Sequence, residues 1–397
     1  MADEPARLEI RAVSSIDQIG AADWDRCAGL SNPFIRHAFL KALEDSDCVG
    51  REAGWLPHHL VVTQTGNPPG GSGVVGCAPL YLKGHSYGEY VFDHGWAAAF
   101  ERAGGSYYPK LQSAVPFTPV TGPRLLVAPD TPDRETIIDA MIDGMASLCR
   151  RNGLSSAHVT FPTEHEWERF GRRDWLQRVG QQYHWFNDGY DSFDDFLATL
   201  TSRRRKQIRR ERREVADAGV RMHAVTGDDL RPEHWDAFYR FYEDTGSRKW
   251  GIPYLNREFF GLLGETMADS VVLVLADYNG RTIAGALNLR GNDTLFGRNW
   301  GCDTHIPFLH FEACYYQAMD FAIDNGLTKV EAGAQGEHKI QRGYLPVRTF
   351  SAHYISHQGL RRAVANFVEQ EAVHIAEDME DLAGFAPFKR TPPGRSE

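Results

Sequence analysis

The sequence predicts an α+β protein made of two units of one plan, each a mostly antiparallel sheet covered by helices. A chain of 397 residues, 42% of them hydrophobic, is long enough to build more than one core. Its second half shows a hairpin signal followed by a long amphipathic segment, and its first half repeats that order more loosely. We expect one unit at residues 1–190, a second at 191–390 and a flexible tail at 391–397.

The second half has the clearest order of elements. Asn279 and Gly280 lie between two β-rich runs, and because both residues tolerate positive φ they predict a hairpin. Pro307 suits the first turn of the long helix after the sheet, and Gly326 suits its C-cap. The expected elements are, in order, a basic helix, strand 220–225, helices 232–246 (ending at Gly246) and 258–267, the hairpin 270–290, strand 294–300, helix 307–326, strand 328–333, a short helix 337–344, strand 347–355 and a final helix.

The first half follows the same plan with weaker signals. A Gly/Pro/Ser-rich stretch, GNPPGGSG, is typical of a turn between two strands of a meander. The expected elements are strand 8–13, helices 21–30 and 36–46, strands 58–66 and 73–83, helix 134–153 and strand 155–161.

Composition and charge exclude several classes of protein. A net charge of −10 and a pI near 5.9 argue against a surface that binds DNA nonspecifically, since that mode needs many cations. The six cysteines form no C-x-x-C pair, so we expect reduced thiols and no metal site. The start of the chain has no basic segment followed by an apolar one, and no apolar run approaches the ~18 residues of a membrane span. We therefore expect a cytoplasmic protein.

Six segments carry a resemblance to a known family: NPFIRHAFLKALE, YVFDHGWAAAFERAGGSYYPKLQSAVPFTPVTGPRLL, SRRRKQIRRERR, RKWGIPYLNREFF, FGRNWG and VEAGAQGEHKIQRGYLP. The order of elements resembles the GNAT acyltransferase fold. Tandem GNAT units with a basic helix opening the second resemble the bacterial Fem-type peptidoglycan aminoacyl-transferases and their predicted N-acyltransferase relatives. The resemblance implies transfer of an acyl or aminoacyl group to an amine on a small molecule or peptidoglycan precursor. It implies no tightly bound cofactor, the donor being aminoacyl-tRNA or an acyl-CoA.

Residues 298–303, RNWGCD, depart from the GNAT pattern. Acetyl-CoA-dependent members hold the pyrophosphate with backbone N–H groups between the third meander strand and the long helix. Arg298 and Gly301 keep that spacing, but Asp303 replaces a glycine or alanine, and a carboxylate repels a pyrophosphate. Coenzyme A is therefore the less favoured donor, while Arg298 remains a predicted substrate-binding residue.

The basic segment places eight arginines and lysines among residues 203–213. With Ser202 as N-cap, several cations occupy the first helical turn, where the helix dipole favours negative charge, so an anion or an acidic loop is expected at that end. Pairs such as Arg210 with Glu214 and Arg213 with Asp217 fit a solvated face instead. The alternatives are that face, a local site for phosphates of a substrate or tRNA, and a DNA-reading helix, which the acidic charge disfavours. The predicted phosphate-binding residues are Arg203, Arg204, Lys206 and Arg209.

Residues 331–344, EAGAQGEHKIQRGY, are the strongest candidate for catalysis. Glycines directly after a strand let backbone approach a ligand while polar side chains converge. Glu331, Glu337 or His338 is the expected base for an attacking amine, and Lys339 or backbone N–H groups are the expected oxyanion donors. A loop held by internal ion pairs is the alternative. The predicted binding residues here are Gln335, Arg342 and Tyr344.

A second candidate segment lies in the first unit. The stretches FDHGWA and SYYPKLQ gather polar and aromatic residues without regular periodicity, which is typical of functional loops. The predicted binding residues are Asp93, His94, Trp96, Tyr108 and Lys110, although a histidine satisfied within the core is an alternative for His94. The resemblance adds Trp250 as a substrate-binding residue.

The competing hypothesis is a non-catalytic protein. A fold does not settle activity, so a binder of a cell-wall precursor or nucleic acid on a degenerate acyltransferase fold accounts for the same features. Loss of turnover with binding retained, after alanine substitution of Glu331, Glu337 and His338, separates the two hypotheses.

Overall fold

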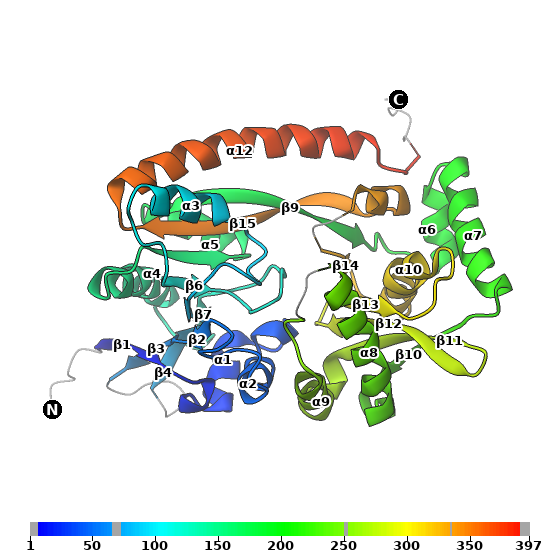
Figure 1. Ribbon diagram of the computed structural model, residues 1–397, viewed down its shortest axis with the longest axis horizontal. Coiled ribbons are helices and arrows are strands. Elements are labelled where there is room, and N and C mark those ends of the chain that lie inside the picture. Colours follow the sequence, from blue (N-terminus) through cyan, green and yellow to red (C-terminus); the bar gives the residue numbers. More distant parts are fainter. Residues whose placement is uncertain (1–6, 66–72, 250–252, 334–335, 390–397) are drawn as a thin grey trace. The chain divides into compact units, whose positions relative to one another are not determined.

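The computed structural model describes residues 7–65, 73–249, 253–333 and 336–389. The chain forms two compact units (Figure 1). The first comprises Met1–Gly180, Tyr254–Thr266 and Arg348–Ile375, and the second comprises Gln181–Pro253, Met267–Val347 and Ala376–Glu397. The predicted α+β class is confirmed, whereas the end of the first sequence repeat near residue 190 stays a prediction. The expected tail at 391–397 lies outside the described residues.

The first unit divides its strands between two sheets. A four-stranded antiparallel sheet has the order β1-β3-β4-β7, formed by β1 (Leu8–Val13), β3 (His59–Gln64), β4 (Val74–Ala78) and β7 (Leu126–Val127). The second has the order β2-β5-β6-β8-β15, formed by β2 (Trp55–Pro57), β5 (Tyr81–Lys83), β6 (Lys110–Ser113), β8 (Ser156–Thr160) and β15 (Leu345–Ile355). In it, β6 and β8 are parallel and place Gln112 beside His158.

Helices cover these sheets because their apolar positions recur at helical spacing. Helix α4 packs Met141, Ile142 and Met145 into the core beside Leu60 and Val159. The helices of this unit are α1 (Ala21–Ala28), α2 (His37–Asp45), α3 (His94–Arg102), α4 (Arg134–Arg151), α5 (Glu164–Arg172), α9 (Arg257–Thr266) and the first part of α12 (Gln358–Gly384), with short 3₁₀ turns at Ile16–Gln18 and Pro33–Ile35.

The second unit is built on one sheet of order β10-β11-β12-β13-β14-β9. The predicted hairpin is confirmed, with Asn279 at φ 50 and Gly280 at φ 76 between its strands. The strands are β10 (Arg221–Thr226), β11 (Val271–Tyr278), β12 (Arg281–Arg290), β13 (Thr294–Cys302), β14 (Lys329–Glu331) and β9 (Leu176–Phe186), which enters this unit from the first.

The helices of the second unit differ from the predictions at their ends. The helix predicted to stop at Gly246 continues to Lys249, and Gly246 is needed because a Cβ there would lie 3.0 Å from Pro253 Cγ. The long helix begins at Leu309, not Pro307, after Phe308 at φ 65. The helices are α6 (Phe193–Thr199), α7 (Ser202–Asp217), α8 (Pro232–Lys249), α10 (Leu309–Phe311), a π-helical segment Glu312–Tyr316, α11 (Gln317–Asp324), and 3₁₀ turns η3 (Gly227–Asp229), η4 (Ala268–Ser270) and η6 (Glu337–Arg342).

Candidate functional site

The candidate site lies where two parallel strands of the second unit stop pairing. β13 and β14 pair through three positions, the last joining Phe296 to Glu331. β13 then continues to Cys302, whereas β14 ends at Glu331. β13 therefore continues past the last position at which it pairs with β14, and Glu331 occupies that position.

Glu331 is a buried carboxylate with one free oxygen. Its Oε1 accepts an ion pair from Lys329 Nζ at 2.8 Å, while its Oε2 has no hydrogen-bond partner among the described residues. Burial raises the pKa of Glu331, and the charge of Lys329 opposes that shift. The arrangement keeps a lone pair of Glu331 available in a low-dielectric setting.

His184 on β9 faces Glu331, and the sequence analysis missed it. The two residues are register partners, with His184 Nε2 3.9 Å from Glu331 Oε2. Burial lowers the pKa of His184 to about 3, so its imidazole is neutral at pH 7. In the sequence, His184 appears as one residue of an alternating run, QYHWF. Nothing in that run shows that its strand pairs with a residue 147 positions away.

Lys339 lies on η6 and turns back to the end of β14. Its Nζ donates to the carbonyls of Ala332 and, at 3.3 Å, Gly333. Burial lowers its pKa to about 8. The neighbouring His338 is exposed, and its Nε2 lies 3.0 Å from Tyr315 Oη; burial, with the charges of Arg342 and Lys339, lowers its pKa. Lys339 and His338 thus come from adjacent positions of the predicted catalytic segment.

Three predicted residues cannot be placed with Glu331. Trp250 and Gln335 lie outside the described residues, and the side chain of Glu337 does as well. Their assigned roles stay predictions.

Arg342 and Tyr344 lie inside the unit. The guanidinium of Arg342 donates to Glu211 at 2.8 and 2.9 Å and to Tyr316 Oη at 3.0 Å, and it stacks over Phe311 at 3.4 Å. Arg342 is 4% exposed and Tyr344 fully buried. A buried charge needs this kind of pairing, so Arg342 joins η6 to α7 through Glu211. The roles predicted for Arg342 and Tyr344 as substrate ligands stay predictions.

Helix α7 has one buried face and one exposed face that carries most of its cations. Ile208, Glu211 and Val215 are buried. The exposed face carries Arg203, Lys206, Arg209, Arg210 and Arg213, at spacings that repeat along one side of the helix. The predicted phosphate-binding residues therefore lie mostly on the solvent face, while Arg204 is half-buried and donates to Gln341 at 2.9 Å.

The start of α7 differs from the prediction. Thr201, not Ser202, is the N-cap residue, and it makes no side-chain cap. No acidic side chain pairs with Arg203 or Lys206 in the part of the chain that the structure describes; the first such contact is Arg209 with Asp194 at 2.8 Å. Arg210 pairs with Glu214 at 3.4 Å as predicted. Among the described residues, the dipole at this end thus has cations beside it and no acidic side chain paired with Arg203 or Lys206.

A hollow of about 460 Å³ lies between α6 and α7. Its floor includes Phe193, over which Arg212 stacks at 4.4 Å while pairing with Asp320 at 2.6 Å. Arg209 and Arg213 line the same hollow. The exposed cations of α7 therefore continue into a depression large enough for part of a ligand.

Residues 298–302 do not lie between the third meander strand and the long helix, where GNAT proteins place the pyrophosphate loop. Residues 298–302 belong to β13, so the connection before the long helix runs from 303 to 308 and contains no glycine. Gly301 serves packing, because a Cβ there would lie 2.2 Å from the carbonyl oxygen of Phe241 on α8. Asp303 is paired with Arg281 at 2.9 Å. The residues compared with a pyrophosphate loop are thus explained by structure: they belong to strand β13, and Gly301 makes room for helix α8.

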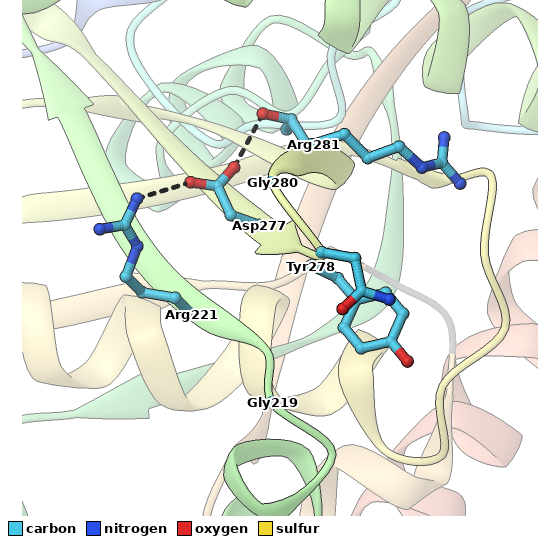
Figure 2. A pocket seen from close by; sticks show the side chains of 8 residues that line it. Gly219, Arg221, Asp277, Tyr278, Gly280 and Arg281 are labelled. Carbon is cyan, nitrogen blue, oxygen red and sulfur yellow. Dashed lines mark hydrogen bonds and ion pairs between the residues drawn. The ribbon is translucent and has the colours of Figure 1, made fainter.

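A second hollow, of about 380 Å³, lies at the β11–β12 turn (Figure 2). Asp277 accepts from Arg221 at 3.1 Å and from Thr282 at 2.8 Å. Because Asp277 already neutralises Arg221, this hollow lacks the free charge expected of a phosphate site.

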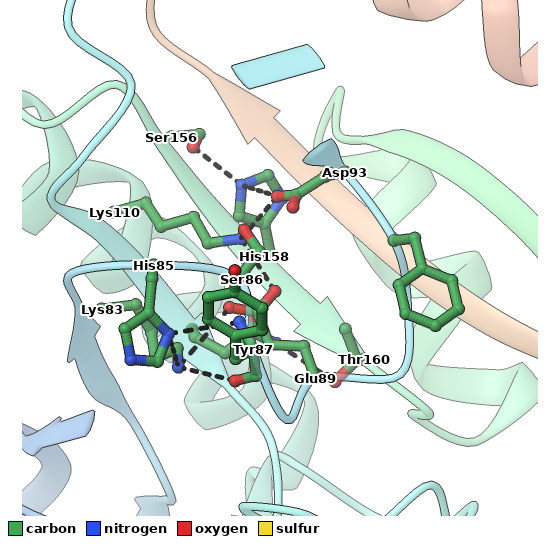
Figure 3. Close-up of polar contacts among 12 residues, drawn as sticks. Lys83, His85, Ser86, Tyr87, Glu89, Asp93, Lys110, Ser156, His158 and Thr160 are labelled. Atoms are coloured by element: carbon green, nitrogen blue, oxygen red, sulfur yellow. Dashed lines mark hydrogen bonds and ion pairs between the residues drawn. The ribbon is translucent and has the colours of Figure 1, made fainter. Parts of the chain in front are cut away.

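The predicted residues of the first unit meet around a buried lysine (Figure 3). Lys110 is fully buried and donates to Ser86 Oγ at 2.9 Å, Glu89 Oε2 at 2.8 Å and Asp93 Oδ2. Burial works against ionisation of Asp93, but the charge of Lys110 outweighs it and lowers the pKa of Asp93. Tyr108 joins through its Oη, 2.8 Å from Ser86 Oγ. Asp93, Lys110 and Tyr108 are thus brought together.

His94 and Trp96 make no hydrogen bond to Lys110 and differ in burial. His94 is exposed, whereas Trp96 is buried against His353, with ring centroids 4.9 Å apart. The sequence analysis also missed Lys83, which is fully buried and stacks over Trp55 at 3.5 Å. Burial lowers its pKa to about 6, while Glu89, 3.9 Å away, has its pKa raised to about 7 by burial.

Both units place a histidine at the same point of the fold. In the first, His353 on β15 is the register partner of His158 on β8, and their Nδ1 atoms are 2.7 Å apart. In the second, His184 on β9 is the register partner of Glu331 on β14. Each pair lies beside a parallel strand pair, so the two centres are equivalent in topology. His158 and His353 lie within hydrogen-bond distance of each other, whereas Glu331 Oε2 has no hydrogen-bond partner among the described residues.

A family model of FemAB-like proteins, described as peptidoglycan biosynthesis/recognition, matches residues 15–390. The chain belongs to the FemAB-like family. This confirms the resemblance on which the Fem-type assignment rested, and it connects the chain to peptidoglycan at the level of the family. No curated protein matches the sequence significantly.

Solved structures share the fold of this chain. The crystal structure of FemX covers 90% of this chain and 100% of its own, with a TM-score of 0.53 and 11% identity. The C-terminal domain of a putative lysylphosphatidylglycerol synthetase from Agrobacterium fabrum gives 0.52 and 8%, covering 88% of this chain and 96% of its own. A tandem GNAT protein of the clavulanic acid biosynthesis pathway gives 0.44 and 12%, covering 88% and 98%. At these identities the likeness concerns the fold alone.

The described residues form neither a metal-binding cluster nor a membrane-spanning helix. Across the described ranges, no cluster of three or more His, Cys, Asp or Glu side chains could hold a metal ion. The helices within the same ranges are too short or too polar to cross a bilayer.

Proposed function

We propose that this FemAB-like protein transfers an acyl or aminoacyl group to an amine of a peptidoglycan precursor in the cytoplasm. The observation that carries the proposal is the end of β13–β14 pairing at Glu331, whose Oε2 has no hydrogen-bond partner among the described residues, with Lys339 bonded to the carbonyl of the next residue, Ala332. An acyl transfer needs a base for the amine and a donor for the developing oxyanion. Glu331 and Lys339 supply one of each within the same loop region.

The proposed step is a direct transfer. The amine nitrogen forms a bond to the carbonyl carbon of the donor while Glu331 accepts the proton that the amine releases. The oxyanion is stabilised by the ammonium of Lys339 and by nearby backbone N–H groups. The bond to the leaving oxygen or sulfur then breaks, and the leaving group takes up the proton. The neutral His184 holds the geometry at Glu331 without adding a competing charge.

Helix α7 supports aminoacyl-tRNA as the donor over an acyl-CoA. Its exposed cations have few protein partners, and they extend into the hollow beside Phe193. A phosphate backbone is bound by several spaced cations, whereas coenzyme A needs a compact pyrophosphate loop. The connection at 303–308 has no glycine to bring backbone N–H groups close to a pyrophosphate.

Substitution Glu331→Gln tests the reaction. Purified protein is mixed with charged tRNA or acyl-CoA and with a UDP-linked muramyl pentapeptide, and the product is measured by mass spectrometry. We expect kcat to fall about 100-fold or more, the usual effect of losing a general base, with little change in KM. The exposed Glu265 offers a matched control, since Glu265→Gln makes the same chemical change away from the candidate site. Equal rates for Glu331→Gln and wild type would exclude Glu331 as the base.

Charge removal on α7 tests the donor. The triple variant of Arg203, Lys206 and Arg213 to alanine should weaken tRNA binding and flatten its salt dependence, because fewer counterions are released. Arg231→Ala, at an exposed arginine before α8, is the control and should leave the salt slope unchanged. A wild-type protein that binds precursor but transfers no group from either donor would instead support the non-catalytic binder.

A further inference from the structure

The segment between β5 and α3, residues 84–93, inverts the usual arrangement of side chains. Ser86, Glu89 and Asp93 point inward and are buried. Three aromatic side chains point outward instead: Tyr87 is 61% exposed, Tyr90 40% and Phe92 63%. Large exposed rings gathered in one short segment are unusual on a protein surface and mark binding sites.

The inward side chains anchor this segment to the sheet. Lys110 bonds Ser86, Glu89 and Asp93, all three of which come from the segment. The carbonyl of Tyr87 accepts from Lys83 Nζ at 3.1 Å (Figure 3) and also from Trp55 Nε1 at 3.2 Å. Burying a charge is costly unless it is paired, and the pairing of Lys110 with Glu89 and Asp93 leaves the segment little freedom. The exposed rings are therefore held in place before any ligand arrives.

The backbone of the same segment is strained at Tyr90. Tyr90 has φ 59, in the left-handed region that a bulky side chain rarely adopts. Strain of this kind persists where the surrounding structure imposes it, and it concentrates at ligand sites.

The rings form a row. His85 and Tyr87 have centroids 5.2 Å apart, Tyr87 and His94 5.8 Å, and His94 and Phe92 6.2 Å. His85, Tyr87, Phe92 and His94 together form the aromatic row. Its outer members, His85 and Phe92, belong to the segment, whereas His94 begins α3. The rings of the first two pairs are inclined at 62° and 53° and those of the third at 27°, so a ligand meets chiefly the exposed surfaces of Tyr87 and Phe92.

The charges of the segment indicate an uncharged ligand. Both lysines that approach it, Lys83 and Lys110, are fully buried beneath the row and bonded to the segment itself. The row presents ring faces with hydroxyl and imidazole edges. The ring of a sugar has one face of C–H groups, whose positive hydrogens suit the negative face of an aromatic ring, and hydroxyl groups around its rim that suit polar edges.

We propose that the aromatic row binds an N-acetylhexosamine ring of the acceptor, a role that rests on the proposed action of the protein on a peptidoglycan precursor. The rings stack on the apolar face of the sugar, and the buried lysine cluster preorganises them. Preorganisation spares the ligand the entropy of ordering a loop. The first unit thereby supplies sugar recognition, while the chemistry belongs to the candidate site in the second.

Calorimetric titration with N,N′-diacetylchitobiose, a neutral disaccharide of this sugar, tests the proposal without donor or transfer. The wild-type protein should bind it, and Tyr87→Ala and Phe92→Ala should each weaken binding about 5- to 10-fold, the effect of losing one stacked ring. Leu30→Ala is the control, since Leu30 is 62% exposed in the same unit and outside the row. Both rings are exposed, so the variants should fold, which circular dichroism checks.

Uridine monophosphate is the contrasting probe. Binding of this nucleotide that Tyr87→Ala and Phe92→Ala abolish, with no binding of the disaccharide, would show a nucleobase site and overturn the proposal. A wild-type protein that ignores the disaccharide at millimolar concentration, or equal weakening by Leu30→Ala, would overturn it as well. The two proposals fail separately: Glu331→Gln should retain disaccharide binding, and loss of transfer in that variant says nothing against the row.

Discussion

Replacing Lys83 with methionine should stabilise the protein at pH 7 and destabilise it near pH 10.5. The side-chain nitrogen of Lys83 is enclosed between the Trp55 ring and the Tyr87 carbonyl, and burial lowers its pKa from 10.5 to about 6, so the folded protein holds it as a neutral amine at pH 7. The unfolded chain therefore binds one more proton than the folded chain between about pH 6 and pH 10.5. Stability of the wild type must rise with pH across that window.

The magnitude follows from the width of the window. The pKa of Lys83 in the unfolded chain lies about 3.5 pH units above pH 7. Folding at pH 7 requires Lys83 to release its proton, which costs about 5 kcal/mol. Methionine fills similar space without that cost but loses the hydrogen bond to Tyr87, a loss of about 1 to 2 kcal/mol. The Tyr87 carbonyl keeps Trp55 as a donor. The expected change in unfolding free energy is a gain of about 3 kcal/mol at pH 7 and a loss of about 1 kcal/mol at pH 10.5.

Urea denaturation at pH 7 and pH 10.5, compared between variant and wild type at each pH, measures this change of sign. Lys110→Met is the matched contrast: Lys110 is equally buried, but Glu89 and Asp93 outweigh burial and raise its pKa. That variant should lose stability at both pH values, because it leaves two buried carboxylates without their cation. A Lys83→Met protein that is less stable than wild type at pH 7 would show that Lys83 is charged in the folded state and refute the reasoning.

Three further outcomes follow from the second unit. Glu211→Ala should lower the unfolding free energy by about 3 to 5 kcal/mol, because it leaves Arg342 buried without its carboxylate, and urea denaturation checks this. Gly301→Ala should cost about 1 to 3 kcal/mol by the same measurement, since the new Cβ meets a helix carbonyl at 2.2 Å, whereas Gly144→Ala, with its nearest contact at 3.4 Å, should cost less. The transfer rate should fall as pH rises through about 8, where Lys339 loses its proton, and Lys339→Arg should move that fall to higher pH; an unchanged profile would remove Lys339 as the oxyanion donor.

Local signals in the sequence predicted elements that local chemistry decides. Asn279 and Gly280 made the hairpin predictable because few other residues accept positive φ. The element boundaries were less predictable: Gly246 reads as a helix end, yet α8 passes through it because the chain at Pro253 crosses close by. Gly301 reads as part of a phosphate loop, yet its missing side chain makes room for α8. A glycine shows that space or an unusual φ is needed, but only the fold shows which.

The candidate site divides in the same way. Glu331, His338 and Lys339 were predictable because they lie within nine residues of one another after a strand. His184 was not, since it reaches Glu331 through strand pairing across 147 positions of sequence. The charge run of α7 announced an anion site, but the sequence cannot separate Arg203 and Lys206, which face solvent, from Glu211, which faces Arg342 inside.

The sequence by itself determined the class of the protein: two α+β units, a basic helix, and a polar loop after a strand of the second unit. These follow from periodicity, charge and turn chemistry, each of which acts over a few residues. The tertiary structure decided which charges are buried and which strand faces which. It placed Lys83 and Lys110 beneath an outward row of aromatic rings, an inversion that no hydrophobic pattern predicts, because burial of a charge depends on partners that arrive from elsewhere in the chain.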